Sequence, residues 1–297
     1  MLREVDQSHS FVDDVPPYAR AEKRGTSISG KELWIPQSNM DLHIEYPVPT
    51  VLELAVMWSD YMEGDTSSLT TADGVYGVFA QPVRDITGFA SIDLCEVVRQ
   101  THVGLHMIER DDPDAITDYH KYTPDHAIRD DLTPAAQVLI NAGLIPPVEN
   151  IHAIRTIMRR WKQNGIYTFA NTSTLPGCEP GTVRFLKTFL DGCFDGILFP
   201  RNHHGSLPLT KGIAAKLLIE TVCQGAACSP RRAIHIDDSP HHNISFRNEL
   251  QQSGLETAAF APQYPTTLSY DHNHMTVTDT PLSAFQLADD FLTKEIK

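Results

Sequence analysis

The sequence has no stretch that approaches the ~20 consecutive apolar residues of a membrane-spanning helix. Its first residues, MLREVDQSHSFVDD, are acidic and polar and contain no apolar run typical of a secretory signal. The five cysteines have no CxxC spacing, which argues against a disulfide framework and against a zinc knuckle. From these absences we expect a cytoplasmic protein that does not associate with membranes.

Basic residues are also few. The 24 Lys and Arg residues stand against 38 Asp and Glu residues, so the formal net charge is −14 at pH 7. An acidic surface repels phosphate backbones, and general nucleic-acid binding is therefore not expected. A small phosphorylated molecule stays compatible with this charge where a local cation or metal overrides it. The composition, with 41% hydrophobic and 21% charged residues, is that of a globular protein.

Short apolar runs alternate with helical patterns from about residue 75 onward. Strands are predicted at 74–80, 89–94, 166–170, 194–199 and 233–237, and helices at 97–109, 133–144, 147–163, from 181, and 211–224. This alternation predicts an α/β fold with a doubly wound parallel sheet whose central strands are 89–92, 166–170, 194–199 and 233–237. We expect an N-terminal extension (1–70, partly irregular), an α/β core (71–110 and 145–297) and a small helical cap (111–144).

Charged residues stand where ligands of parallel sheets bind, at the carboxyl ends of strands. Asp237 and Asp238 end an apolar run, and adjacent carboxylates there favour a cation such as Mg²⁺, which prefers oxygen ligands. The alternative is a turn in which Asp238 caps the next helix. Lys211 begins a predicted helix, an unfavourable place for a cation unless an anionic group lies nearby.

Two further strand ends carry polar groups. Asn171 and Thr172 begin the sequence NTST, whose amide and hydroxyl groups suit a phosphate but equally suit an ordinary capping turn. Asp93 follows the strand at 89–92, where it is a candidate nucleophile or metal ligand, or part of a surface turn.

The order of these groups (Asp, hydroxyl cluster, Lys, Asp-Asp) resembles the motifs of the haloacid dehalogenase (HAD) superfamily over about residues 89–265. The closest likeness is FDGILF…KGIAAKLLIE…AIHIDDSP, which is similar to the third and fourth motifs of that superfamily. The resemblance implies a HAD-like Rossmannoid core with a small cap, as in nucleotidase-like members that act on phosphate monoesters.

The first motif of the superfamily, Asp-x-Asp, has two competing registers in this chain. IDLCEVVRQTH aligns Asp93 with the nucleophile and Cys95 with the second Asp, the general acid/base. VFAQPVRD instead places Ala80 and Pro82 at these positions and removes both acids. We favour the first register. Glu96 is not counted as part of the site, because it would point elsewhere if the strand continued.

The second motif is also ambiguous. Its hydroxyl normally closes the strand, where Ala170 falls if Asn171 is the Asn that commonly follows. Thr172 supplies the hydroxyl only if the strand runs two residues further.

The resemblance implies a Mg²⁺-dependent phosphohydrolase that acts on a small phosphate monoester, a nucleotide included, through an aspartyl-phosphate. The implied roles are catalytic for Asp93, Lys211 and Thr172; substrate-binding for Asn171, Thr172 and Lys211; and metal-ligating for Asp93, the backbone carbonyl of Cys95, Asp237 and Asp238. Asp237 is expected at a solvent-facing strand end, so that Asp237→Asn would weaken metal binding and leave the fold intact.

Two alternatives stay open because Cys95 stands where a second Asp belongs. One is a catalytically silent HAD-like protein that binds a ligand or a protein partner. The other is a reaction on a carbon–halogen or carbon–phosphorus bond, known from members that lack the second Asp. The histidine pairs, among them His241 and His242, are not expected to form a metal site, since adjacent side chains diverge in strands and helices.

Overall fold

The computed structural model describes residues 21–26, 32–36, 66–70, 75–80, 82, 84–98, 147–172, 179–200, 210–224, 228–262 and 275–294. Side chains are described from residue 77 onward, Cys95 excepted. The cap expected at 111–144, the helix expected at 133–144 and nearly all of the helix expected at 97–109 lie outside these residues.

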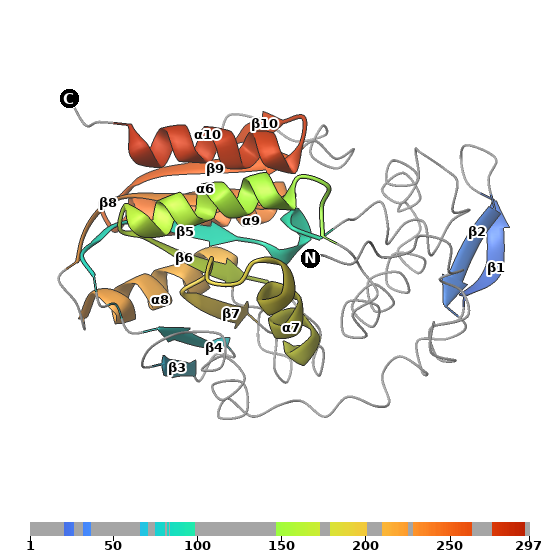
Figure 1. Ribbon diagram of the computed structural model, residues 1–297, viewed down its shortest axis with the longest axis horizontal. Coiled ribbons are helices and arrows are strands. Elements are labelled where there is room, and N and C mark those ends of the chain that lie inside the picture. Colours follow the sequence, from blue (N-terminus) through green and yellow to red (C-terminus); the bar gives the residue numbers. More distant parts are fainter. Residues whose placement is uncertain are drawn as a thin grey trace, which may run out of the picture.

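Eight of the described strands form one mixed sheet in the order β10-β9-β8-β5-β6-β7-β4-β3 (Figure 1). Their bounds are β3 Thr66–Thr70, β4 Val75–Ala80, β5 Ile86–Ile92, β6 Ile166–Asn171, β7 Gly196–Pro200, β8 Cys228–Ile236, β9 Glu256–Pro262 and β10 Thr276–Thr278. The strands from β10 to β7 are parallel, and β4 and β3 join antiparallel at the edge. The predicted α/β class with a mainly parallel sheet is confirmed, and the four expected central strands are neighbours.

The position of β5 bears on the two registers of the first motif. β5 pairs with β8 on one side and with β6 on the other, and Ile92 is level with Ile236. β4, the strand of the competing register, instead pairs antiparallel with β7, away from β8. The strand that ends before Asp93 therefore lies beside the strand that ends before Asp237, as the favoured register requires.

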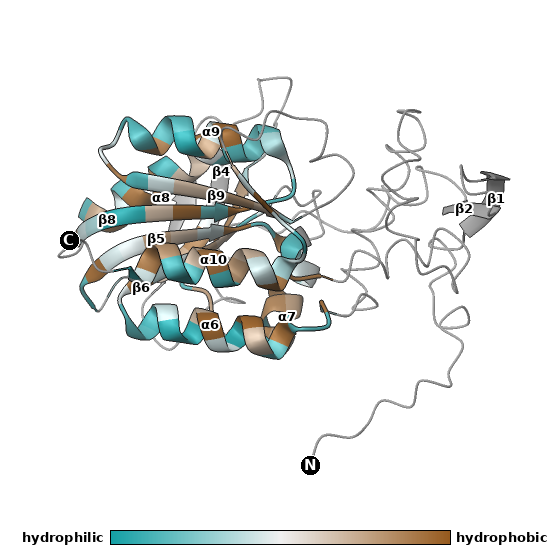
Figure 2. Cartoon of the chain, turned by 90° about the horizontal axis from the view of Figure 1, so that it is seen from above, coloured by the Kyte–Doolittle hydropathy of each residue, from teal (hydrophilic) through white to brown (hydrophobic). Residues whose placement is uncertain are grey.

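Helices cover both faces of the sheet (Figure 2). Helices α6 (Ile151–Gln163), α7 (Glu179–Phe189) and α10 (Pro281–Thr293) share one core cluster, and α8 (Lys211–Gln224) and α9 (Pro240–Gln251) share the other. Side chains of β6 alternate between the clusters, with Ile166 and Ala170 in the first and Tyr167 and Phe169 in the second. This period of two is what a strand buried on both faces requires.

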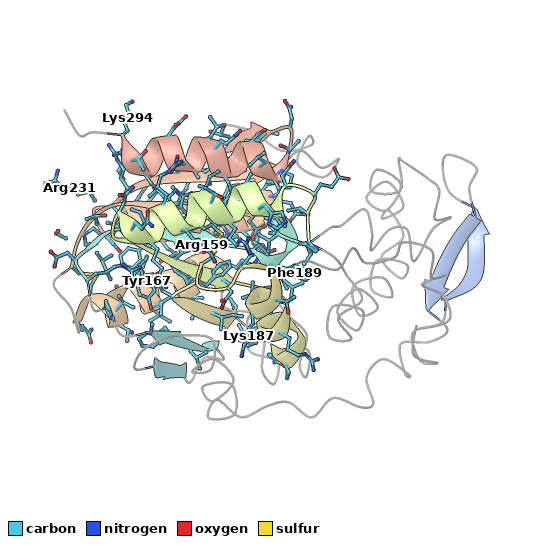
Figure 3. All side chains as sticks on the ribbon, in the orientation of Figure 1. Arg159, Tyr167, Lys187, Phe189, Arg231 and Lys294 are labelled. Atoms are coloured by element: carbon cyan, nitrogen blue, oxygen red, sulfur yellow. The ribbon has the colours of Figure 1, made fainter. Side chains whose placement is uncertain are left out.

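Side chains also tie the antiparallel edge to the parallel strands. Tyr167, labelled in Figure 3, is fully buried, and its hydroxyl donates a hydrogen bond of 2.8 Å to the carbonyl of Ala80 at the end of β4. On the other side of the sheet, Trp161 of α6 donates a 2.9 Å hydrogen bond to Asp289 of α10 and stacks on Phe285.

Several elements differ from the expectations. β1 (Ala21–Thr26) and β2 (Glu32–Pro36) form an antiparallel hairpin, and β3 joins the main sheet, although all three lie in the segment 1–70 expected to be an extension. The strand expected to reach residue 94 ends at Ile92, and a 3₁₀ turn, η2 (Leu94–Glu96), follows. Within the described part of the chain, no helix has the length and apolar character to cross a membrane.

Candidate active site

Four residues from three elements meet at the carboxyl ends of the central strands. Asp93 follows β5, Asp237 and Asp238 follow β8, and Lys211 begins α8. Carboxylate oxygens of the three aspartates lie within 4.8 Å of one another. The Lys211 ammonium lies 3.0 Å from Asp93 Oδ2 and 2.6 Å from Asp237 Oδ2. The structure thus brings together these four residues, which the motifs had selected from distant parts of the sequence.

Lys211 is held at the start of α8 by its neighbours. Its side chain is only 2% exposed, so its charge depends on the two carboxylates it contacts. The side-chain amide of Asn171 donates to the Lys211 carbonyl at 2.9 Å. Gly212 lets α8 approach α9, because a Cβ there would lie 2.4 Å from the carbonyl oxygen of Ser245. The contacts of Asn171 indicate that it positions Lys211; its expected role in substrate binding stays a prediction.

Asp237 is fully buried, so the expectation of a solvent-facing strand end is wrong. Its Oδ1 accepts a 2.7 Å hydrogen bond from the Ser239 amide, and its Oδ2 lies 3.0 Å from His242 Nδ1 and 3.3 Å from His235 Nε2. Burial by itself raises the pKa of Asp237, but Lys211 and the two histidines together hold this pKa well below its ordinary value. Asp237→Asn would therefore also remove a charge partner of the buried lysine and destabilise the fold.

Asp238, a member of this cluster, and Glu96, which lies near it, have pKa values that are shifted upward. Burial and the charges of Asp237 and Asp93 raise the pKa of Asp238 from 3.8 to about 7, although its side chain retains some contact with solvent. Glu96 is fully buried, and burial together with the charges of Asp238, Asp237 and Asp93 raises its pKa well above the ordinary value. Glu96 does not point elsewhere, because the strand ends at Ile92 and the chain turns back.

The two histidines are site residues that the sequence reasoning missed. His235 is fully buried, with its ring 3.0 Å from Ser91 Oγ and stacked on Phe246. Burial lowers the pKa of His235 and favours the neutral imidazole. The strand pattern contained a signal for this residue, since positions 235 and 237 lie two apart and two-residue spacing places side chains on one face of a strand. The contact of His242 with Asp237 had no such signal.

For the remaining expected residues, Thr172 and Cys95, the structure gives the position of the backbone. β6 ends at Asn171, so Ala170 does not close the strand, and Thr172 follows directly. Thr172 is buried, and its amide donates a 3.1 Å hydrogen bond to the carbonyl of Leu198 on β7. Cys95 lies in the 3₁₀ turn after Asp93, and its side chain lies outside the described residues. The roles expected of the Thr172 hydroxyl and of the Cys95 carbonyl stay predictions.

The donor set of this cluster fits a small divalent cation. Asp93 Oδ1 is buried without a hydrogen-bond partner among the described residues, while Asp93 Oδ2 contacts Lys211. Unpaired buried carboxylate oxygens are costly, and oxygen-only ligand sets of this kind suit Mg²⁺. Lys211 offsets one negative charge of the cluster, which leaves an excess of acid for a cation to compensate.

Each motif position assigned from the resemblance lies at the same edge of one mainly parallel sheet, and Asp93 and Asp237 end neighbouring central strands. No family model matches the chain, and no curated protein matches it.

Two solved structures are similar to this chain. CbbY from Rhodobacter sphaeroides, solved in complex with phosphate, has 11% sequence identity and a TM-score of 0.40, with 66% of this chain and 96% of CbbY covered. The HAD domain of the effector protein Lem4 from Legionella pneumophila has 9% identity and a TM-score of 0.33, with 61% of this chain and 88% of that domain covered.

Proposed function

We propose that this protein is a Mg²⁺-dependent phosphohydrolase that acts on a small phosphate monoester, a nucleotide included, through an aspartyl-phosphate on Asp93. The state of the Asp93 carboxylate carries the proposal. One oxygen contacts Lys211 at 3.0 Å, and the other is buried with no hydrogen-bond partner among the described residues. A carboxylate that is oriented on one side and unpaired on the other suits nucleophilic attack.

In this mechanism one oxygen of the Asp93 carboxylate attacks phosphorus, an O–P bond forms, and the bond from phosphorus to the leaving oxygen breaks as that oxygen takes a proton from solvent. Water then hydrolyses the aspartyl-phosphate and releases inorganic phosphate. Lys211 orients the nucleophile and stabilises negative charge on the transferring group. Asp93, Asp237, Asp238 and the Cys95 carbonyl would hold Mg²⁺, which supplies charge neutralisation of the phosphoryl oxygens.

A second candidate function, a catalytically silent ligand-binding protein, is favoured by one feature of the sequence. Cys95 stands where the second acid of the first motif belongs. A positioned general acid contributes typically ~10²–10⁴-fold to the rate, and a thiol with an ordinary pKa of about 8.5 is a poor substitute. The two candidates differ in one observable, namely metal-dependent turnover.

The test is hydrolysis of p-nitrophenyl phosphate by the chelator-treated full chain with and without added Mg²⁺. We expect turnover that requires Mg²⁺ and is abolished in Asp93→Asn. Asp85→Asn is the matched control, since Asp85 is an exposed aspartate at the opposite end of the same strand and its variant should keep full activity. A phosphoryl group found on the peptide that contains Asp93 would support the covalent step.

Wild-type protein that binds Mg²⁺ and phosphate without turnover would favour the silent protein. Equal turnover of Asp93→Asn and wild type would contradict the assignment of the nucleophile.

A further inference from the structure

Glu96 is the acid near the site to which neither the motifs nor the proposed mechanism gives a role. It closes the 3₁₀ turn after Asp93, where its amide donates a 3.1 Å hydrogen bond to the Asp93 carbonyl. Its side chain is 0% exposed, and neither carboxylate oxygen has a hydrogen-bond partner of normal geometry among the described residues. A carboxylate this deeply buried normally has a cation or several donors around it.

The surroundings of Glu96 are acidic rather than basic. The charged groups that act on it most strongly are Asp238, Asp237 and Asp93, and the nearby amide of Asp238 offsets them only in part. Lys211 lies on Asp93 and Asp237 instead. Glu96 thus adds a fourth carboxylate to a region that already has more acid than base, and the described residues supply nothing that neutralises it.

A divalent cation would resolve this imbalance. Glu96 lies outside the three residues whose carboxylate oxygens lie within 4.8 Å of one another, so it is not grouped with the direct ligands. A carboxylate outside the ligand set but close to it acts by accepting hydrogen bonds from water on the cation and by adding negative potential. Its burial keeps that potential from being screened by solvent.

We propose that Glu96 is a positioning residue of the cation site, an outer carboxylate that strengthens divalent-cation binding by Asp93, Asp237 and Asp238. This inference rests on the proposed function, because it concerns the same cation. It goes beyond that function because the motif positions do not include Glu96. It also predicts weaker cation binding without loss of stability in Glu96→Gln, whereas replacing a purely structural glutamate would lower stability and leave the affinity unchanged.

The experiment compares wild type, Glu96→Gln and Glu220→Gln. Binding of Mg²⁺, and of Mn²⁺ as a second probe, is measured by titration calorimetry, and the melting temperature is measured in chelator and in excess Mg²⁺. Removing a partner in the outer shell of a metal typically costs ~10–100-fold in affinity, so we expect at least ~10-fold weaker binding by Glu96→Gln. In chelator its melting temperature should equal or exceed that of wild type, because an amide of similar size replaces a buried carboxyl group that has no hydrogen-bond partner of normal geometry and adds no charge to the acidic cluster. Glu220 is exposed on α8, and its variant should match wild type in both measurements.

Glu96→Asp keeps the charge on a shorter side chain and should recover part of the lost affinity, which also covers the case in which Glu96→Gln does not fold. Wild-type affinity in Glu96→Gln, or a lower melting temperature in chelator with unchanged affinity, would overturn the inference and assign Glu96 a structural role. If wild type itself binds neither Mg²⁺ nor Mn²⁺, the cation part of the proposed function fails, and this inference fails with it. The behaviour of wild type therefore distinguishes the two failures.

Discussion

One buried aspartate lies at the amino ends of the parallel strands (the amino edge) and another lies at their carboxyl ends (the carboxyl edge). The two have opposite surroundings. Asp195, just before β7 at the amino edge, is 1% exposed, and its carboxylate lies 2.7 Å from Arg84 and 3.2 Å from Lys162 and accepts a 3.0 Å hydrogen bond from the Thr168 amide. Asp237, at the carboxyl edge, shares the single cation of Lys211 with Asp93 and has Asp238 and Glu96 nearby.

The comparison separates a cluster whose charges are balanced from one that has an excess of acid. At the amino edge, two cations and an amide satisfy one carboxylate, which is what a buried charge needs in order to stabilise a fold. At the carboxyl edge, Asp238 and Glu96 lie near a lysine whose charge is already shared by Asp93 and Asp237, an arrangement that costs stability unless something else binds. We therefore expect substitutions at the amino edge to change stability and substitutions at the carboxyl edge to change binding and rate.

The largest effect is expected from Asp195→Ala. Breaking a buried ion pair typically costs ~3–5 kcal/mol, and we expect the lower end because Arg84 and Lys162 still reach solvent, with side chains 26% and 31% exposed. The free energy of unfolding from denaturant titration measures this loss. Asp195→Asn, which keeps an acceptor for the Thr168 amide, should lose less. A fully stable Asp195→Ala protein would remove the distinction between the two edges.

The two edges were also unequally predictable from the sequence. Asp93, Lys211 and Asp237 were found because apolar runs marked the strands and because charged residues at strand ends are unusual. The helix expected at 211–224 has these bounds in the structure. The balanced cluster was not found, since Arg84 and Asp195 lie on two separate connections and Lys162 lies in the last turn of α6, and local sequence does not show that these meet.

Other parts of the fold lacked a local signal for different reasons. β9 has the sequence ETAAFAP, in which small alanines take the place of the β-branched residues that favour strands, and β10 has only three residues. Glu96 was misjudged because its direction depends on whether the strand continues past Ile92, and neither a strand nor a turn is excluded by LCE. Tertiary pairing decides such boundaries.

The second largest effect is expected from Cys95→Asp, which restores the acid missing from the first motif. If Asp93 is the nucleophile, phosphatase turnover should rise by up to the ~10²-fold lower end of a general acid's contribution. In a silent protein the same change should bring no gain in turnover, and any cost of the added charge would be seen as a lower melting temperature. Rate and melting temperature measured on one preparation separate these outcomes.

Ala80→Asp is the matched control for Cys95→Asp at the other edge of the sheet. Ala80 ends β4, and its amide donates a 2.7 Å hydrogen bond to the Asp195 carbonyl. An aspartate there should leave the rate unchanged and lower stability by placing like charges close together. A gain in turnover from Ala80→Asp would contradict the register based on Asp93.

A smaller effect is expected from Gly212→Ala, which tests how closely α8 must approach α9 to hold Lys211. The added methyl group would lie 2.4 Å from a backbone oxygen of α9, so one helix has to move. Such overpacking typically costs ~1–3 kcal/mol. Because the displaced helix carries Lys211, we also expect a lower rate, measured with p-nitrophenyl phosphate. Lost stability with an unchanged rate would show that Lys211 tolerates the shift.

The smallest effect is a pH dependence that only the carboxyl edge should show in the metal-free protein. The folded-state pKa of Asp238 is raised from 3.8 to about 7 by burial and by Asp237 and Asp93, with Lys211 opposing, and that of Glu96 is raised as well. Between these pH values the folded protein binds more protons than the unfolded chain, so the free energy of unfolding falls as pH rises. The lowered pKa of Asp237 acts in the opposite sense only below its ordinary value of 3.8, outside this window, whereas the lowered pKa of His235 opposes the trend inside it, below the ordinary histidine value of 6.5.

Denaturant titrations in chelator at about pH 5 and about pH 7.5 should therefore show lower stability at the higher pH, because the two acids with raised pKa outweigh the one histidine with lowered pKa. Asp238→Asn should flatten this slope because it removes the titrating group, whereas Asp290→Asn, at an exposed position on α10, should keep it. Saturating Mg²⁺ should reverse the trend, since a cation binds the ionised carboxylates and stabilises the folded state more as they lose protons. If the free energy of unfolding depended on pH in Asp238→Asn as it does in wild type, the excess of acid at the carboxyl edge would not control stability. The carboxyl-edge cluster would then differ from the Asp195 cluster in its ion pairs alone.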